Sequence, residues 1–434
     1  MFTLIVYNIL LLIFSPFVAL YLFWRLVIIG KSRDGILERL GFVPARKCAG
    51  SEPRIWLHAV SVGESVAARP VWEEMLEVLP GWRLYHSTMT DTAQVQAAKA
   101  VGTRGEMLYF PFDFFPCVWL ALSRVRPSLI VLVETEMWPN FLAVAHLLGI
   151  KVMMVNGRIS DRSLRGSTHL GPLYRWMTTN IDRYCMQSPG DAERIIAIGA
   201  APDRVTVTGN TKFDQIMAPV SLGEQVKLRG KLGLTRDEPL LLAGSTHEGE
   251  EDIVLRAFRQ VKTADPRVRL IIAPRNINRA QEVEDLVSAH GFPVARRTRM
   301  ATIPPPPDAV IILDTIGELA RAYALCTVAF VGGSLIPIGG HNVLEPLAMG
   351  KPVVFGPCMS NFRDIAVIVN EAGIGMTIHD AAELAARWLE LLNDPQRRRT
   401  IADTAAVIFT EHRGASTRSA HAAALLVGSP VQEL

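Results

Sequence analysis

The sequence predicts an α/β protein with two doubly wound parallel sheets and an apolar helix in front of them, and three observations lead to this prediction. Short segments rich in Val, Ile and Leu alternate with amphipathic stretches of roughly 10–15 residues, which is the pattern of parallel strands covered on both faces by helices. The alternation is interrupted near residues 214–235, which include Pro219 and Gly223. Residues 1–24 carry no charged side chain. Two domains that face each other across a cleft are the simplest arrangement that fits.

Composition excludes several classes of protein. The chain has 434 residues, of which 49% are hydrophobic and 20% charged, and this disfavours a disordered protein and a coiled coil. The formal net charge of +3 is too small to suggest nucleic acid as a partner. The five cysteines are widely spaced, so they predict neither a disulfide framework nor a zinc ribbon, and they fit a reducing compartment.

The N-terminal segment, residues 1–24, is expected to anchor the chain in a membrane. It is almost wholly apolar, and a helix of about 20 such residues just spans the hydrocarbon core of a bilayer. It has neither the basic start nor the small-residue cleavage site of a signal peptide. Arg25, Lys31 and Arg33 follow it, so the positive-inside rule would keep the rest of the chain in the cytoplasm. Pro16 and the marginal length leave a buried or interfacial helix open as the alternative.

The first domain is expected over residues 25–220. Its apolar segments predict strands at 54–60, 84–87, 128–133, 151–155, 184–187 and 204–208. Its amphipathic segments predict helices at 65–79, 92–100, 140–148 and 190–198.

The second domain is expected over residues 221–434. Its strands are predicted at 240–243, 269–273, 310–313, 328–331 and 352–355. The proline run at 304–307 is stiff and is expected in a surface loop. The last helices of the chain are candidates for packing back on the first domain.

Charged side chains gather where strands of the first domain end. Glu64 follows the first predicted strand, at the start of a helix. Glu134 and Glu136 follow the third strand, and Lys212 follows the sixth. Because ligands bind at the carboxyl ends of parallel strands, these groups predict a site on that edge of the sheet. An acid in the first turn of a helix is as often a capping partner, so for Glu64 that alternative stays open.

The second domain contains turns that suit phosphate. Residues 243–250 follow a strand and open a helix, so their backbone N–H groups suit an anion, with an ordinary N-cap as the alternative. Arg275 ends the next strand, where a guanidinium can bind phosphate through two parallel hydrogen bonds. The glycine pairs at 332–333 and 339–340 allow a nucleotide to approach the backbone closely. No D-x-D or H-E-x-x-H motif occurs and the histidines lack ligand spacing, so no metal site is expected.

A family resemblance rests on several of these motifs together. They are residues 61–65, 134–140, 156–160, 209–213, 243–250, 274–275 and 332–356. In this order, and with the N-terminal segment, they resemble 3-deoxy-D-manno-octulosonic acid (Kdo) transferase, the membrane-anchored enzyme of Gram-negative lipopolysaccharide synthesis. The resemblance covers almost the whole chain and implies the GT-B glycosyltransferase fold, with two Rossmann-like domains.

The resemblance also implies roles for particular residues. Glu64 matches the general base of the family. Glu134 and Lys212 match positions that support the transition state, with Glu136 as the alternative to Glu134. The positions that hold the cytidylate are matched by Pro274, Arg275, Ile316, Gly317, Glu318, Asn342, Val343, Leu344 and Glu345.

The reaction implied is transfer of Kdo from cytidine monophosphate-Kdo (CMP-Kdo) to a lipid A precursor of the lipid IVA type. Glu64 would take the proton from an acceptor hydroxyl as that oxygen attacks the anomeric carbon, with inversion of configuration and without a metal or cofactor. The expected partners are CMP-Kdo, the lipid A precursor and inner-membrane lipid, with the catalytic body on the cytoplasmic side.

Two other interpretations remain open. One is a sugar-nucleotide epimerase or hydrolase on the GT-B fold, because a fold alone does not decide its chemistry. The other is a non-catalytic, membrane-tethered nucleotide-binding protein, which would need neither Glu64 nor Lys212. An enzyme acting on a soluble sugar nucleotide gains nothing from a membrane anchor, and this favours the transferase.

Overall fold

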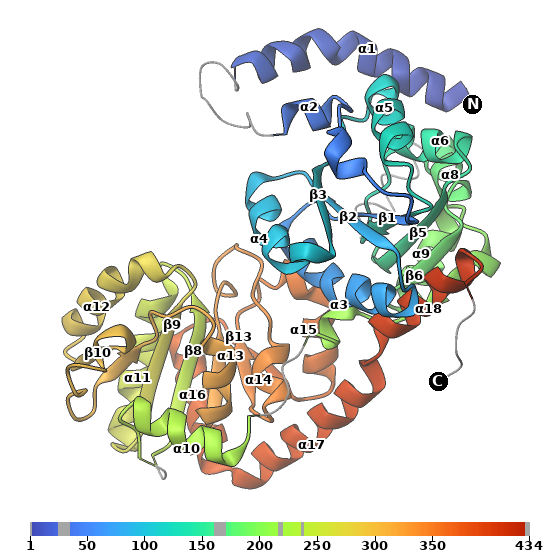
Figure 1. Cartoon of the computed structure of the whole chain (residues 1–434). Coiled ribbons are helices and arrows are strands. Elements are labelled where there is room, and N and C mark those ends of the chain that lie inside the picture. The colour runs from blue at the N-terminus through green and yellow to red at the C-terminus, as the bar shows by residue number, and fades with distance from the viewer. Residues whose placement is uncertain (1, 25–34, 160–170, 216–219, 236–237, 430–434) are drawn as a thin grey trace. The chain divides into compact units, whose positions relative to one another are not determined.

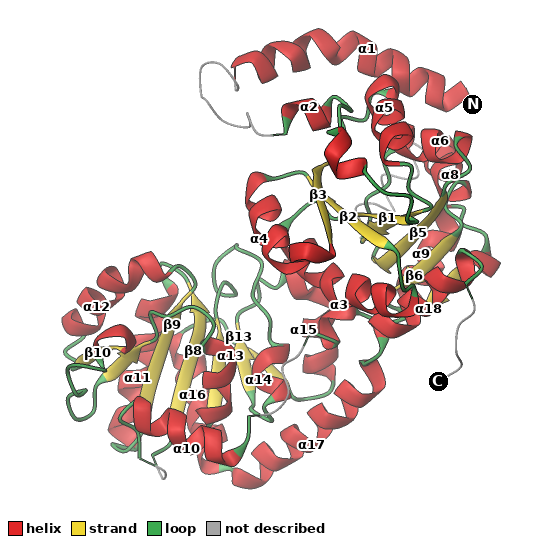
Figure 2. Cartoon of the chain, in the orientation of Figure 1, coloured by secondary structure: helices red, strands yellow, loops and turns green. Residues whose placement is uncertain are grey.

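A computed structural model of the chain describes residues 2–24, 35–159, 171–215, 220–235 and 238–429 (Figure 1). The chain divides into two compact units, Met1–Gln215 with His412–Leu434 (unit 1) and Ile216–Glu411 (unit 2). Each unit is a parallel sheet with helices on both faces (Figure 2). The second unit therefore ends at Glu411, before the end of the domain expected from the sequence.

Unit 1 is built on a parallel sheet whose described strands have the order β3-β2-β1-β4-β5-β6-β7. The strands are β1 (Arg54–His58), β2 (Arg83–Thr88), β3 (Gly105–Tyr109), β4 (Leu129–Val133), β5 (Lys151–Gly157), β6 (Arg183–Met186) and β7 (Val205–Val207). The chain reverses its direction of travel across the sheet between β1 and β4, which lie side by side. In open α/β sheets the carboxyl ends of such a strand pair form the ligand-binding crevice.

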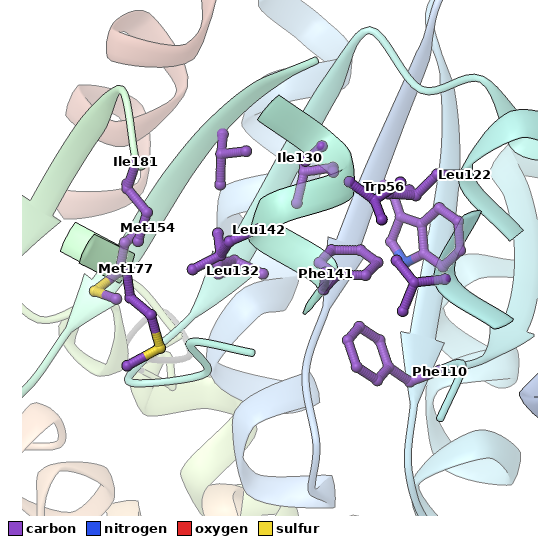
Figure 3. Packing of buried hydrophobic residues seen from close by; sticks show 14 of the residues in the cluster. Trp56, Phe110, Leu122, Ile130, Leu132, Phe141, Leu142, Met154, Met177 and Ile181 are labelled. Atoms are coloured by element: carbon purple, nitrogen blue, oxygen red, sulfur yellow. The ribbon is translucent and has the colours of Figure 1, made fainter. Parts of the chain in front are cut away.

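Helices cover both faces of this sheet and bury its apolar side chains. The helices of unit 1 are α1 (Phe2–Phe23), α2 (Ile36–Arg39), α3 (Val62–Val78), α4 (Asp91–Val101), α5 (Phe115–Val125), α6 (Pro139–Leu147), α8 (Gly171–Thr179), α9 (Pro189–Ile198) and α18 (Ala415–Leu426). Alternate residues of a strand point to opposite faces, so Ile130 packs in one core and Val131 in the other. Figure 3 shows the first core, where Phe141 of α6 lies between Trp56 and Phe110, with ring centroids 5.6 and 4.7 Å away.

Helix α18 completes the second face of the sheet in unit 1. Its residues Ala420, Ala423 and Ala424 are fully buried in one core with Val71 and Trp72 of α3. Asp214 holds the start of this segment by accepting hydrogen bonds from the backbone N–H groups of Gly414 and Ser416, both at 2.7 Å. The small alanine side chains let α18 approach α3 closely.

Unit 2 repeats the plan with a strand order of β10-β11-β9-β8-β12-β13-β14 among its described residues. Its strands are β8 (Leu240–Thr246), β9 (Arg269–Pro274), β10 (Val294–Arg296), β11 (Val310–Ile312), β12 (Val328–Val331), β13 (Val353–Phe355) and β14 (Gly375–Thr377). Its helices are α10 (Leu222–Lys231), α11 (Glu250–Ala264), α12 (Ala280–Ala289), α13 (Leu319–Ala322), α14 (Leu344–Ala348), α15 (Arg363–Glu371), α16 (Ala381–Asn393) and α17 (Pro395–His412). Strands β8 and β12 are the neighbours at which the order reverses, so their carboxyl ends form the equivalent crevice.

Every strand predicted from the sequence is present, with ends that differ by at most three residues. The strands that the sequence did not predict are β3, β10 and β14, and all of them lie at an edge of a sheet. An edge strand has a neighbour on one side only and is less completely buried. Its sequence therefore lacks the continuous Val, Ile and Leu run that marks a central parallel strand.

Helix α1 is fastened to unit 1 by polar side chains that interrupt its apolar sequence. The Tyr7 hydroxyl donates to Asp113 at 2.9 Å, and Asn8 exchanges amide hydrogen bonds of 2.8 and 3.0 Å with Asn140. Within the part of the chain that the structure describes, no helix is long and apolar enough to cross a membrane. The spanning anchor expected at residues 1–24 is therefore not supported, and its Tyr and Asn side chains bond to the folded unit. The basic residues expected to set its orientation, at 25–34, lie outside the described residues.

Candidate active site

Glu64 lies where β1 turns into α3, at the reversal point of the first sheet. Ser61 is the N-cap of α3, and its hydroxyl accepts from the Glu64 backbone N–H. In return the Glu64 carboxylate accepts from the Val60 backbone N–H at 2.8 Å and from the Ser61 hydroxyl at 3.0 Å. Ser61 and Glu64 thus cap the helix reciprocally, as in a capping box but with the carboxylate bonded to the residue before the N-cap, so the capping role that the sequence left open is present.

The capping role does not exclude a role in proton transfer. Burial raises the pKa of the Glu64 carboxyl, and the negative charge of Glu134 raises it further. The hydrogen bonds from Val60 and Ser61 and the positive charge of Arg158 act in the opposite direction. Each carboxylate oxygen accepts one hydrogen bond and so keeps a second lone pair for a substrate proton. A carboxylate with a raised pKa is a better general base than an exposed one.

Glu134 and Glu136 lie after β4, the strand beside β1. Glu134 has a positive φ of 58°, a left-handed conformation that is uncommon outside glycine, and it turns the chain immediately after the last strand residue. The side chain of Glu136 accepts from the Trp138 indole at 3.0 Å. Burial raises the pKa of Glu136 to about 7, with further contributions from the charges of Glu64 and Glu134. The mutual effects of these carboxylates place them in one electrostatic cluster.

A positively charged side chain, Arg158, lies beside this cluster. Arg158, just beyond the end of β5, lies with a guanidinium nitrogen 3.4 Å from Glu134. The turn that carries Arg158 is held by Thr135, whose hydroxyl donates to the Arg158 carbonyl at 2.8 Å. From the sequence, Arg158 belongs to a run of arginines that could face the acceptor phosphates or lipid headgroups, and its pairing with Glu134 was not expected. Its pairing with Glu134 depends on β4 and β5 being neighbours in the sheet.

Lys212 lies in a short turn that is docked against the same strand ends. Thr211 donates its hydroxyl to the Ala67 carbonyl of α3 at 2.9 Å, and its backbone N–H to the Asn156 side chain at 3.1 Å. The Lys212 backbone N–H donates to Asn210 at 3.0 Å. The turn is thus fixed both to α3, which carries Glu64 in its first turn, and to the end of β5.

Unit 2 carries the residues expected to hold the nucleotide, and they follow strands β9, β11 and β12. Pro274 is the last residue of β9, and Arg275 follows it with an exposed side chain and a backbone N–H that bonds to Thr246 at 2.9 Å. Ile316, Gly317 and Glu318 follow β11, which pairs with β9, so the two segments are neighbours along the sheet edge.

Glu318 is held in place at the start of α13. It accepts hydrogen bonds from the Thr315 hydroxyl and from Arg297. Burial raises the pKa of the Glu318 carboxyl, but these bonds outweigh it and hold the pKa below the usual value. Ile316 beside it is 85% exposed, an apolar side chain open to a ligand.

The segment Asn342, Val343, Leu344 and Glu345 forms the start of α14. Asn342 accepts from the Leu344 backbone N–H at 3.1 Å and lies against the Glu345 carboxylate. Burial raises the pKa of Glu345, while Asn342 and the charge of Arg275 lower it. Arg275 therefore acts electrostatically on this segment, although the two follow different strands.

The glycine-rich turn at 332–335 is occupied by a side chain of the protein. Glu250, which is fully buried, accepts from the backbone N–H groups of Gly333 at 2.7 Å, Ser334 at 3.0 Å and Leu335 at 2.9 Å. It also accepts from the His247 backbone N–H at 3.0 Å. The Glu250 carboxylate thus already binds the backbone N–H groups of Gly333, Ser334 and Leu335, the turn that contains the first of the two glycine pairs.

Glu250 also brings together residues that sequence reasoning did not connect. The loops after β8 and β12 place the imidazoles of His247 and His341 with their Nε2 atoms 2.8 Å apart. The two histidines are 94 residues apart and share no ligand spacing, so no local pattern could have paired them.

Among the described residues, no group of three or more His, Cys, Asp or Glu side chains could hold a metal ion.

Comparison with known proteins identifies the family. The family model described as 3-deoxy-D-manno-octulosonic-acid transferase (Kdo transferase) matches residues 34–215. The chain is 34% identical over 388 residues to the 3-deoxy-D-manno-octulosonic acid transferase of Bordetella pertussis, covering 88% of this chain and 89% of that protein. It is 30% identical over 418 residues to the enzyme of the same name from Haemophilus influenzae, covering 95% and 96%.

Among solved structures, UDP-GlcNAc 2-epimerase from Neisseria meningitidis bound to UDP-GlcNAc is similar, with a TM-score of 0.57 and 12% identity over 86% of this chain and 99% of that one. This likeness shows the fold alone, that of two-domain enzymes with parallel sheets. The sequence identities to the two transferases extend over nearly the whole length of this chain and of each transferase. The chain therefore belongs to the 3-deoxy-D-manno-octulosonic acid transferase family and is a glycosyltransferase.

Proposed function

We propose that this chain transfers Kdo from CMP-Kdo to a lipid A precursor of the lipid IVA type, at the cytoplasmic face of the inner membrane. The observation that carries the proposal is the carboxylate cluster at the reversal point of the first sheet. There the Glu64 carboxyl has a raised pKa and lies in the electrostatic field of Glu134 and Arg158. This is where α/β sheets bind substrates, and the cluster supplies the base that an inverting transfer requires.

In this mechanism the acceptor hydroxyl loses its proton to Glu64 as its oxygen attacks the anomeric carbon of Kdo. The bond from that carbon to the cytidylate oxygen breaks, and the electron pair leaves with the phosphate. A single displacement inverts the configuration and needs no covalent intermediate or metal ion. Lys212 and Arg158 are the cations of unit 1 assigned to stabilising negative charge that develops at the reacting centre.

Unit 2 is assigned to the donor. Arg275 is an exposed guanidinium at the carboxyl end of β9, suited to a charge-assisted contact with the nucleotide. Residues 316–318 and 342–345 would hold the cytidine and ribose from either side. The proposal requires the acceptor hydroxyl bound by unit 1 to reach the anomeric carbon of the donor bound by unit 2.

A membrane surface is where the acyl chains of the acceptor reside, and α1 presents apolar side chains to solvent. Leu12, Phe17 and Leu20 are 71%, 69% and 68% exposed. Exposed apolar groups on one helix are a feature of segments that lie in a membrane interface. We therefore assign α1 to holding unit 1 at the inner membrane.

The experiment that tests the proposal is incubation of the purified protein with CMP-Kdo and tetraacylated lipid A precursor, followed by mass spectrometry of the lipid. The expected result is a gain of mass equal to one or more Kdo residues, which depends on both substrates. Release of cytidylate without a glycosylated lipid would instead indicate a hydrolase. Interconversion of sugar nucleotides without any acceptor would indicate an epimerase, for which the fold likeness to UDP-GlcNAc 2-epimerase is the supporting observation.

The donor site is tested separately by Arg275→Ala. Loss of a charge-assisted contact, typically worth about 1.5–3 kcal/mol, should weaken CMP binding by roughly ten- to a hundredfold. Isothermal titration calorimetry with CMP measures this loss of affinity. Arg267→Ala is the matched control, because Arg267 is exposed and pairs with Asp265 before β9, at the other end of the strand. Equal affinity in both variants would remove Arg275 from the nucleotide site.

A further inference from the structure

Two histidines meet at the reversal point of the second sheet, in the crevice between the ends of β8 and β12. His247 is the first residue after β8, and His341 lies in the loop between β12 and α14. Their Nε2 atoms are 2.8 Å apart, and the two ring planes are parallel to within 2°, with centroids 5.1 Å apart. This is a direct hydrogen bond between imidazoles, in the place where this class of sheet binds its ligand.

The pair is held by buried contacts from both loops. The Glu250 carboxylate accepts from the backbone N–H of His247 and from that of Gly333, which ties the loop after β8 to the loop after β12. Gly333 lies directly against the rings, so a Cβ atom there would come within 2.9 Å of the His341 ring. Gly333 also has a φ of 65°, and both constraints favour glycine at this position.

The geometry limits the number of protons that the pair can hold. Only one hydrogen atom fits between the two Nε2 atoms, so one ring donates and the other accepts. A doubly protonated pair would point two N–H groups at each other and is excluded. Burial lowers the pKa of His341 to about 4, and the charges of Arg275 and His247 lower it further. The imidazole of His341 is therefore uncharged near neutral pH.

The groups around the pair favour an anion over a cation. Arg275 after β9 contributes a positive charge that acts on His341. The carboxylate of Glu250 is engaged by backbone N–H groups, and the carboxylate of Glu345 on α14 lies against the Asn342 side chain. Glu248, on the same loop as His247, is exposed to solvent. A phosphate supplies the negative charge that would compensate a proton on the pair.

We propose that the His247–His341 pair, together with Arg275, binds the phosphate of the nucleotide and takes up one proton when that phosphate becomes a dianion. The inference rests on the proposed function, since the phosphate is that of CMP-Kdo. The donor is a phosphodiester with one negative charge. When the bond to the anomeric carbon breaks, the electron pair stays on the phosphate oxygen and the charge becomes two. The proton that the pair takes from solvent then offsets the additional charge, while the acceptor proton resides on Glu64.

The test is calorimetry with CMP and with cytidine, in two buffers of different ionisation enthalpy at about pH 7.5, above the second pKa of a phosphate monoester. Wild-type protein is expected to take up a proton on binding CMP and none on binding cytidine. His341→Gln and His247→Gln should each abolish the uptake and weaken CMP binding by roughly tenfold, because glutamine keeps a donor but cannot be protonated. His290→Gln, at the C-terminal end of α12, is the matched control and should behave as wild type.

A measurement on the wild-type protein keeps the test independent of how the variants fold. With ¹⁵N-labelled histidine, the ring nitrogen resonances of His247 and His341 should move toward the protonated form with CMP and stay in place with cytidine. Binding of CMP without proton uptake or ring shifts would overturn the inference and leave the proposed function intact. An absence of CMP binding by the wild-type protein would overturn the donor assignment and the inference together.

Discussion

At the scale of single residues, burial raises the pKa of both Glu64 and Glu136, but their hydrogen-bond partners differ. Glu64 accepts two hydrogen bonds from its own helix start, which oppose the effect of its burial. Glu136 accepts one, from Trp138, so burial and the neighbouring charges dominate and its pKa reaches about 7. Glu134 has Arg158 beside it. Near neutral pH the cluster thus contains one carboxylate, Glu136, that is partly protonated.

Glu64→Gln tests the base without removing the helix cap. The glutamine carbonyl can still accept from the Val60 N–H, and its amide can donate to the Ser61 hydroxyl, so α3 should remain capped. Turnover should fall by about 10²-fold or more, because an amide cannot take a proton, while CMP affinity stays unchanged. Steady-state kinetics and calorimetry measure the two effects. Near-normal turnover would move the base to Glu136 or Glu134.

Glu136→Gln should change how stability depends on pH. The pKa of Glu136 is about 7 in the folded chain and near 4.5 when unfolded, so between these values folding retains a proton that unfolding releases. Its contribution to stability is therefore present below about pH 4.5 and is lost as the pH rises to about 7. The variant should lose this decline and be more stable than wild type at pH 8, by on the order of 2 kcal/mol.

The readout for Glu136 is urea denaturation of wild type and variant between pH 4.5 and 8. Glu77→Gln on α3 serves as the control, since the Glu77 side chain is exposed. Parallel stability curves for wild type and Glu136→Gln would show that the carboxyl does not titrate with a raised pKa.

At the scale of elements, α1 combines two surfaces with different roles. Its Tyr7 and Asn8 bond to Asp113 and Asn140, at the starts of α5 and α6. The Asp113 carboxyl is buried, which raises its pKa to about 6, and it accepts hydrogen bonds from the backbone N–H groups of Asn140 and Phe141 as well as from Tyr7. The apolar side chains of the helix that remain exposed are then free to contact lipid.

The double variant Leu12→Ser with Phe17→Ser should weaken attachment to membranes. Both side chains are largely exposed, so their replacement removes apolar area from the lipid contact and leaves the core of unit 1 intact. Flotation with vesicles of phosphatidylethanolamine and phosphatidylglycerol measures attachment. Leu222→Ser on α10, 79% exposed, is the control. Equal flotation of all three proteins would show that this face of α1 does not bind lipid.

At the scale of the whole molecule, the chain leaves unit 1 after Gln215, forms unit 2, and returns to unit 1 at His412. The returning helix α18 is part of the core of unit 1, because its buried alanines pack with α3, β5 and β6. The core of unit 1 is therefore incomplete until α18 is in place.

Ala423→Asp tests this dependence. A carboxylate at this fully buried position of α18 has no partner, and it should destabilise unit 1 by about 3 kcal/mol or more. Hydrogen exchange should then increase in β1, β4 and β5 while β8 and β9 keep their protection. Leu425→Asp on the same helix, 65% exposed, should leave both units unchanged. Exchange that increases in both units alike would mean that they unfold together.

The sequence by itself determined the strand and helix pattern, since apolar periodicity reports which faces are buried. It also placed Glu64, Glu134, Lys212 and Arg275 after predicted strands, because the ends of parallel strands can be located from local sequence. The motifs, read in order, were sufficient to suggest the family. These features depend on neighbours in the chain, for which spacing is a reliable guide.

The tertiary structure alone decided which distant residues meet. The edge strands, the bonds that fasten α1, the pairing of Arg158 with Glu134, and the contact of His247 with His341 all join segments that are far apart in the chain. The occupation of the glycine-rich turn by Glu250 belongs to the same group, because a carboxylate 83 residues away takes the N–H group of Gly333. Such contacts follow from the order of strands in the sheet, which no local pattern in the sequence encodes.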